Sequence, residues 1–205
     1  MRFDSSQLQA LGTIAAAIAA LIALFVAWDQ GRVMRAQQHA SVMPILAASV
    51  SFDQIDDRVE LSVVVRNDGV GPAFVESARI LSGGEPMQTM VQFQDTVLPT
   101  ELHDEFIFNG GTIRGALGAG RQQPLVSFIW TASEDRTPAF RALLGQLVSD
   151  DTHLQIETCY CSVFGQCWIA QPGEGARAQP IRSCPNLGDD VYVQLSSSHI
   201  VGDAP

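Results

Sequence analysis

The stretch VELSVVVRNDGVGPAFVESARIL, residues 59–81, decides the fold class because two strand-like runs are joined there by a tight connection. Residues 59–67 and 73–81 are rich in β-branched side chains and partly alternate between apolar and polar positions, which is typical of half-buried strands. Between them, Asp68–Gly69 is a turn dipeptide. Pro72 fixes its own φ and has no N–H to donate, so it suits the start of a strand.

Further strand-like runs lie on both sides of this stretch, at residues 45–52, 124–131, 153–164 and 166–170. The first runs are separated by short turn-rich segments such as DQIDD and DGVGP, whereas residues 86–123 hold an ambiguous stretch, MQTMVQFQDTVL, followed by Gly-rich connections. Several short strands with turns between them predict a mainly β fold, an antiparallel β-sandwich over residues 44–172.

One inserted helix is expected within the sandwich, in TPAFRALLGQLV at residues 137–148. Thr137 is a suitable N-cap, and Pro138 suits the first helical position. The apolar face of this helix would be formed by Phe140, Leu143, Leu144 and Leu147. The Pro- and Gly-rich tail, residues 173–205, is expected to be irregular apart from a short strand at 191–195 and to pack on the domain.

The turn residues Asn67, Gly69, Gly71 and Pro72 form an N-x-G-x-G-P-A motif. This motif resembles one found in many uncharacterised bacterial membrane-anchored proteins, in which a single transmembrane helix and a short stalk precede an immunoglobulin-like domain. The resemblance implies an immunoglobulin-like β-sandwich behind a membrane anchor. It implies no reaction, and it carries no catalytic residue over to this chain.

The segment from Leu8 to Trp28 contains no charged residue, and only Gln9 and Thr13 are polar. As a helix it would be about 31 Å long, close to the thickness of the hydrocarbon core of a bilayer. The apolar run is longer than the core of a signal peptide. A retained single-pass transmembrane helix is therefore favoured over a cleaved signal peptide or a buried soluble helix.

The helical pattern is expected to continue beyond this span. Residues 1–7 form a short N-terminal tail, and residues 29–43 continue as a helical stalk. Pro44 disfavours helix at Met43, so the stalk should stop there.

Small residues recur at every fourth position of the span, in the two series Gly12, Ala16, Ala20 and Ala15, Ala19, Ala23, Ala27. Such spacing lets helix backbones approach closely in lipid and favours self-association. An alanine-rich anchor encoded by a GC-rich genome would show the same pattern. The expected partners are the lipid bilayer, through residues 8–28, and a second copy or another membrane protein.

The stretch CYCSVFGQCW, residues 159–168, contains three of the four cysteines. Residues 162–165 fit a type I turn that is followed by a left-handed residue, Gly165. Such a turn would make a hairpin in which Ser162 pairs with Gln166. Cys161 then lies opposite Cys167, within the Cα separation that a disulfide can bridge.

Cys159 should point to the same face as Cys161, which leaves it for Cys184 in the tail. We therefore favour disulfides Cys161–Cys167 and Cys159–Cys184. Free thiols and a metal site are the alternatives, although the spacing C-x-C-x5-C-x16-C lacks the usual C-x2-C knuckles of zinc sites.

The membrane orientation is indicated by two opposing signals. Arg2 precedes the span and Arg32 and Arg35 follow it, which slightly favours a cytoplasmic domain. A disulfide framework favours an oxidising compartment. The expected location is the bacterial inner membrane, with the domain in the periplasm preferred over the cytoplasm.

Charge excludes one class of partner. The chain carries a net charge of −10, and residues 44–205 hold nine arginines against twenty Asp and Glu, a net charge of −11. An acidic domain is repelled by phosphate backbones, so no nucleic-acid partner is expected.

The leading prediction for function is a membrane-anchored, non-enzymatic interaction or sensing module, either self-associating or part of a membrane complex. No cofactor and no catalytic residue is assigned. One alternative is a metal-dependent hydrolase that uses the acidic loop 101–105, with Glu101, His103, Asp104 and Glu105. The other is a homo-oligomeric membrane scaffold or pore.

Overall fold

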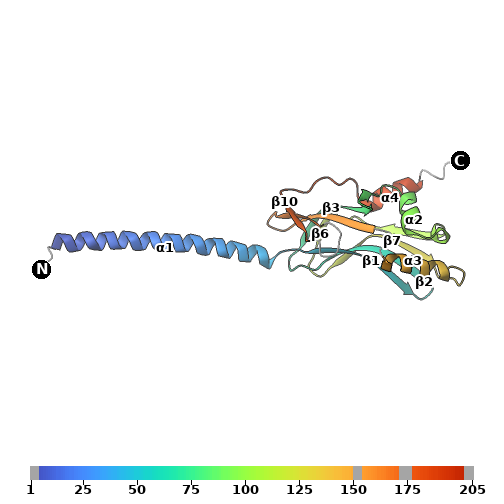
Figure 1. The fold of residues 1–205 in the computed structure, drawn as a ribbon, viewed down its shortest axis with the longest axis horizontal. Coiled ribbons are helices and arrows are strands. Elements are labelled where there is room, and N and C mark those ends of the chain that lie inside the picture. Colours follow the sequence, from blue (N-terminus) through green and yellow to red (C-terminus); the bar gives the residue numbers. More distant parts are fainter. Residues whose placement is uncertain (1–4, 150–153, 171–176, 201–205) are drawn as a thin grey trace. The chain divides into compact units, whose positions relative to one another are not determined.

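A computed structural model of the chain describes residues 5–149, 154–170 and 177–200 (Figure 1). The chain divides into two compact units, one ending at Ser41 and one beginning at Val42. The first unit is a single continuous helix, α1 (Ser5–Ser41), whose portion from Gly12 on is long and apolar enough to cross a membrane. The expected span and stalk are thus one uninterrupted helix. It ends at Ser41 rather than at residue 43.

The second unit is built from two antiparallel sheets. Sheet A has the strand order β1-β2-β7-β5. Its strands are β1 (Leu46–Ile55), β2 (Arg58–Asn67), β7 (Gln122–Thr131) and β5 (Phe106–Gly110). The two strands quoted first in the sequence, β2 and its successor β3, do not pair with each other, because β3 belongs to the other sheet.

Sheet B has the order β10-β9-β8-β3-β4, and a further short strand, β6, also pairs with β3. Its strands are β10 (Gln179–Ile181), β9 (Cys167–Ala170), β8 (Leu154–Cys161), β3 (Ala73–Ser82), β4 (Glu85–Pro86) and β6 (Gly115–Leu117). The mainly β, antiparallel architecture predicted from the sequence is therefore confirmed.

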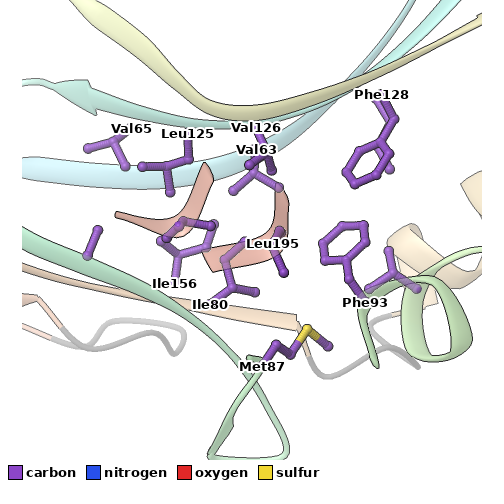
Figure 2. Close-up of a cluster of buried hydrophobic side chains, with 14 of the residues drawn as sticks. Val63, Val65, Ile80, Met87, Phe93, Leu125, Val126, Phe128, Ile156 and Leu195 are labelled. Carbon is purple, nitrogen blue, oxygen red and sulfur yellow. The ribbon is translucent and has the colours of Figure 1, made fainter. Parts of the chain in front are cut away.

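The hydrophobic core lies between the two sheets (Figure 2). Val63 of β2 and Phe128 of β7 approach it from sheet A, and Ile80 of β3 and Ile156 of β8 approach it from sheet B. Phe93 stacks on Phe128 with ring centroids 4.8 Å apart. Burying a side chain of this kind contributes about 1.5–3 kcal/mol, so the inter-sheet cluster dominates the stability of the domain.

One polar side chain of this core reaches from one sheet toward the other. Tyr160 of β8 is 1% exposed. Burial raises the pKa of its phenol, and a hydrogen bond with the backbone of Leu46 at the start of β1 partly opposes that rise.

The prediction of a single inserted helix is wrong, because α2 (Met90–Val97) and α4 (Val191–Ile200) accompany α3 (Thr137–Ser149). Helix α2 lies within the stretch MQTMVQFQDTVL, residues 87–98. Thr89 and Gln92 form a capping box at its start, which satisfies two backbone donors that would otherwise lack partners. Met90, Phe93 and Val97 then share one buried face.

Helix α3 covers the core much as predicted. Phe140 and Leu143 are buried, and Phe140 meets Trp130 edge-on with ring centroids 6.0 Å apart. Leu144 is the exception, since 39% of it is exposed to solvent.

The expectation of an irregular tail is wrong for two segments. Residues 179–181 form β10, and the predicted strand at 191–195 is the first half of α4. Val191 and Leu195, four residues apart, are both buried, while Val193 is 52% exposed. The sequence VYVQL alternates like a strand but forms a helix. In a helix, residues four apart lie on one side, so Val191 and Leu195 both face the core.

Candidate functional site

Asn67, the last residue of β2, organises the turn motif. Its side chain is fully buried, and the amide nitrogen Nδ2 donates to the carbonyl oxygens of Gly71 at 2.8 Å and Leu117 at 3.0 Å. The amide oxygen Oδ1 accepts from the backbone N–H groups of Gly69 at 3.0 Å and Ile45 at 3.3 Å. Both amide hydrogens and both lone-pair directions of this side chain are therefore used.

The backbone of Asn67 is bonded as well. Its N–H donates to the oxygen of Arg121 at 3.0 Å, and its carbonyl accepts from the N–H of Gly120 at 2.8 Å. One residue thus ties together the turn after β2, the strand β6, the loop before β7 and the segment that leads into β1.

The two glycines of the motif leave room for the incoming chain. The segment 42–45 runs against the turn, with the N–H of Asp68 donating to Ile45 and that of Val70 donating to Met43. A Cβ on Gly69 would lie 2.4 Å from the oxygen of Met43, and one on Gly71 would lie 2.0 Å from the oxygen of Val42. We call residues 42–45 together with 67–72 the Asn67 clasp.

An exposed ion pair flanks the clasp. The Nε atom of Arg66 lies 2.6 Å from Oδ1 of Asp68. The hydrogen bond that Arg66 donates to this carboxylate, and then the carboxylate's negative charge, raise the pKa of Arg66. Both side chains are open to solvent, so this pair adds little stability next to the buried amide.

The cysteine hairpin has the predicted geometry. Gly165 has a φ of +73° and donates to the oxygen of Ser162, and the N–H of Ser162 donates to the oxygen of Gln166 at 2.8 Å. This register puts Cys161 directly opposite Cys167.

All four cysteine sulfurs stand at bonding distance in the predicted connectivity. The Sγ atoms of Cys161 and Cys167 are 2.05 Å apart, and those of Cys159 and Cys184 are 2.06 Å apart. The second pair fixes the tail across the outer face of sheet B, where Ser77 of β3 also donates to the carbonyl of Pro185.

We expect the two disulfides to differ in their effect on stability. In the chain-entropy model, a bridge that closes a 25-residue separation stabilises by about 3.5 kcal/mol, and one that closes 6 residues by about 2 kcal/mol. Replacing Cys159 and Cys184 together by alanine should therefore lower the free energy of unfolding in urea more than replacing Cys161 and Cys167. The reverse order would show that the tail is held by its other contacts rather than by the bridge.

A surface cavity of about 450 Å³ adjoins the bridges and is called here the sulfur pocket. Its lining includes Cys161, Cys167 and Cys184, the basic residues Arg114 and Arg182, and the acidic residue Glu76. Arg114 is held in place because it donates to the carbonyl of Gly188.

The acidic loop does not gather into one site. The ring nitrogen Nε2 of His103 lies 3.0 Å from the carbonyl oxygen of Leu98, and Glu105 forms an ion pair with Arg136. Glu101 and Asp104 are exposed. Within the described ranges, the only gathering of three or more metal-binding side chains is that of Cys161, Cys167 and Cys184.

The small residues of the apolar helix α1 lie exposed, in the two series Gly12, Ala16, Ala20 and Ala15, Ala19, Ala23, Ala27. At 100° per residue they share one broad side of the helix. A Cβ added at Gly12 would meet nothing within 4 Å.

Comparison with protein-family models and with curated proteins finds no match to this chain. Sequence reasoning identified Asn67, Gly69, Gly71 and the four cysteines. It missed the segment 42–45 and Leu117, because a sequence motif does not indicate which distant parts of the chain will contact its turn.

Proposed function

We propose that this protein is a membrane-anchored, non-enzymatic interaction module with an immunoglobulin-like domain. The observation that carries the proposal is an apolar N-terminal helix joined at Ser41–Val42 to a unit made of two antiparallel sheets. Such domains commonly present loops and strand edges to partners on the surface of a membrane.

The strand order supports the immunoglobulin-like assignment. The order β1-β2-β7-β5 corresponds to strands A, B, E and D of that fold, and β9-β8-β3-β4 corresponds to G, F, C and C′. The chain departs from antibody domains in its cysteines, since neither bridge joins strands B and F. The helices α2 and α3 are insertions between strands of this scheme.

Two further observations favour an interaction module over a hydrolase. His103 and Glu105 are engaged by Leu98 and Arg136 instead of converging on a substrate position. At the tip of the cysteine hairpin, Val163 is 46% exposed and Phe164 is 52% exposed, which suits contact with a partner.

The two disulfides support a periplasmic location as part of this proposal. Two bridges persist in an oxidising environment, so we place the domain in the periplasm of a bacterium, with α1 in the inner membrane. The prediction is that, in cells quenched with acid, all four cysteines of the full-length chain resist alkylation until a reductant is added. Intact-mass measurement counts the labels. Four cysteines alkylated before reduction would overturn the periplasmic assignment.

Self-association through α1 is expected because small side chains let two helices approach closely in lipid. Replacing Ala19 and Ala23 by leucine should convert an oligomer to a monomer in detergent, measured by light scattering with the detergent subtracted. Ala17→Leu lies off the small-residue face and is the control that should leave the mass unchanged. A monomer before any substitution would exclude self-association and leave a heterologous membrane partner.

A further inference from the structure

The four cysteine sulfurs form one cluster, although they belong to three separate segments. Cys159 and Cys161 project from the outer face of β8, Cys167 comes from β9, and Cys184 comes from the tail. The Sγ atoms of Cys161, Cys167 and Cys184 all lie within 4.8 Å of one another. Since Cys159 is bonded to Cys184, the two disulfides are neighbours.

This spacing is close to that of a four-thiolate zinc centre. Zinc binds sulfur at about 2.3 Å in a tetrahedron, which puts the sulfurs about 3.8 Å apart. The Sγ atoms of Cys161, Cys167 and Cys184 lie within 4.8 Å of one another, at most about 1 Å above that value, and Cys159 joins them through its bond to Cys184. Side-chain rotation after reduction would therefore bring the sulfurs to the required distances without moving the strands far.

The surroundings suit such a centre electrostatically. A zinc ion with four thiolates carries two negative charges. The residues that line the sulfur pocket include Arg114 and Arg182 against the single acidic residue Glu76, so the lining carries a net positive charge beside the cysteines. Positive groups next to cysteines also favour the thiolate, which is the form that binds metal. The pocket opens to solvent, which gives an ion a path to the sulfurs.

We propose that, when both disulfides are reduced, Cys159, Cys161, Cys167 and Cys184 bind one zinc ion. In the test, each bridge takes up two electrons from a phosphine and two protons from water, whose oxygen passes to the phosphine as the phosphine oxide, and gives two thiols. In a cell, a dithiol supplies both the electrons and the protons and becomes a disulfide itself. Zinc then replaces the four thiol protons, which leave to solvent. The tail would thus be fastened to the hairpin in both redox states, by disulfides in an oxidising compartment and by zinc in a reducing one.

The test uses the full-length chain in detergent, made metal-free and reduced with a phosphine under anaerobic conditions. Titration with Co²⁺ should give the thiolate charge-transfer and d–d bands of a tetrahedral site, saturating at one ion per chain. Zinc should then displace the cobalt. Hydrogen exchange should show that zinc restores protection in β8 and β9, which separates a folded site from loose binding to an unfolded chain.

Three variants sharpen the result. Cys184→Ser removes a ligand and should weaken zinc binding by more than about 100-fold, beyond the range for changes outside the ligand set, whereas Arg114→Gln should weaken it by about 10-fold. His103→Asn, in the acidic loop, should change nothing. The proposal is overturned if the reduced chain takes up no metal, if the oxidised chain binds it equally well, if Cys184→Ser has no effect, or if zinc fails to restore protection.

Discussion

Asn67→Ala is expected to lower the free energy of unfolding by about 5 kcal/mol. The substitution removes four hydrogen bonds at a fully buried position and leaves the carbonyls of Gly71 and Leu117 and the N–H groups of Gly69 and Ile45 without that partner. Each buried polar group deprived of its partner costs about 1–3 kcal/mol. The measurement is urea unfolding of the full-length protein in a mild detergent, followed by circular dichroism.

Two further variants test the cause. Asn67→Asp keeps the shape and the acceptor but loses both donors, so it should be nearly as destabilising as alanine above neutral pH. Asn109→Ala is the control, because Asn109 also lies near the end of a strand but is exposed and makes a local bond to Gly110. It should change stability by less than about 0.5 kcal/mol. A loss below about 1 kcal/mol for Asn67→Ala would show that water replaces the amide and that the clasp is not needed.

Gly71→Ala should be almost as damaging, at about 4 kcal/mol, through a different mechanism. The added Cβ would lie 2.0 Å from the carbonyl oxygen of Val42, which is backbone and cannot rotate away. The segment 42–45 must then move and lose its hydrogen bonds to Asp68 and Val70. We expect the loss in unfolding free energy to be accompanied by faster hydrogen exchange at these two N–H groups.

Gly145→Ala is the matched control, because a Cβ at this position of α3 meets nothing within 4 Å. Alanine in a helix interior is more favourable than glycine by about 0.5–1 kcal/mol, so this variant should be slightly more stable than the parent. Equal destabilisation by the two substitutions would mean that any change of glycine is harmful here and that close approach at Gly71 is not the cause.

The strands of the domain could be predicted because their signals are local. The run 59–67 has the β-branched composition of a strand, and the turn that follows it contains Gly and Pro at positions where they are needed. The hairpin at 161–167 could be predicted for the same reason, since Gly165 at the left-handed position fixes the register and the register pairs the cysteines. The helix α1 follows from length and apolar composition alone.

The helices that the sequence did not predict, α2 and α4, have residue patterns that fit a strand and a helix equally well. VYVQL alternates like a strand, yet Val191 and Leu195 also have helical spacing, and the choice depends on which face the core offers. Asp190 helps to decide it, because its carboxylate accepts a hydrogen bond from Thr112, 78 residues away in sequence. In the same way, Phe93 identifies α2 as a core helix only once Phe128 lies beside it.

The sequence by itself determined the long apolar helix, the β class of the domain, the turn at Asn67 and the cysteine hairpin, because each depends on residues within a few positions of one another. Only the tertiary structure decided that β2 and β3 lie in different sheets and that the tail contains a helix. It also decided that Gly71 faces Val42, and that the sulfurs of Cys161, Cys167 and Cys184, the last bonded to Cys159, lie together in a pocket lined by two arginines. These contacts join segments far apart in the chain, and packing selects them by burying the apolar faces of both sheets around one core.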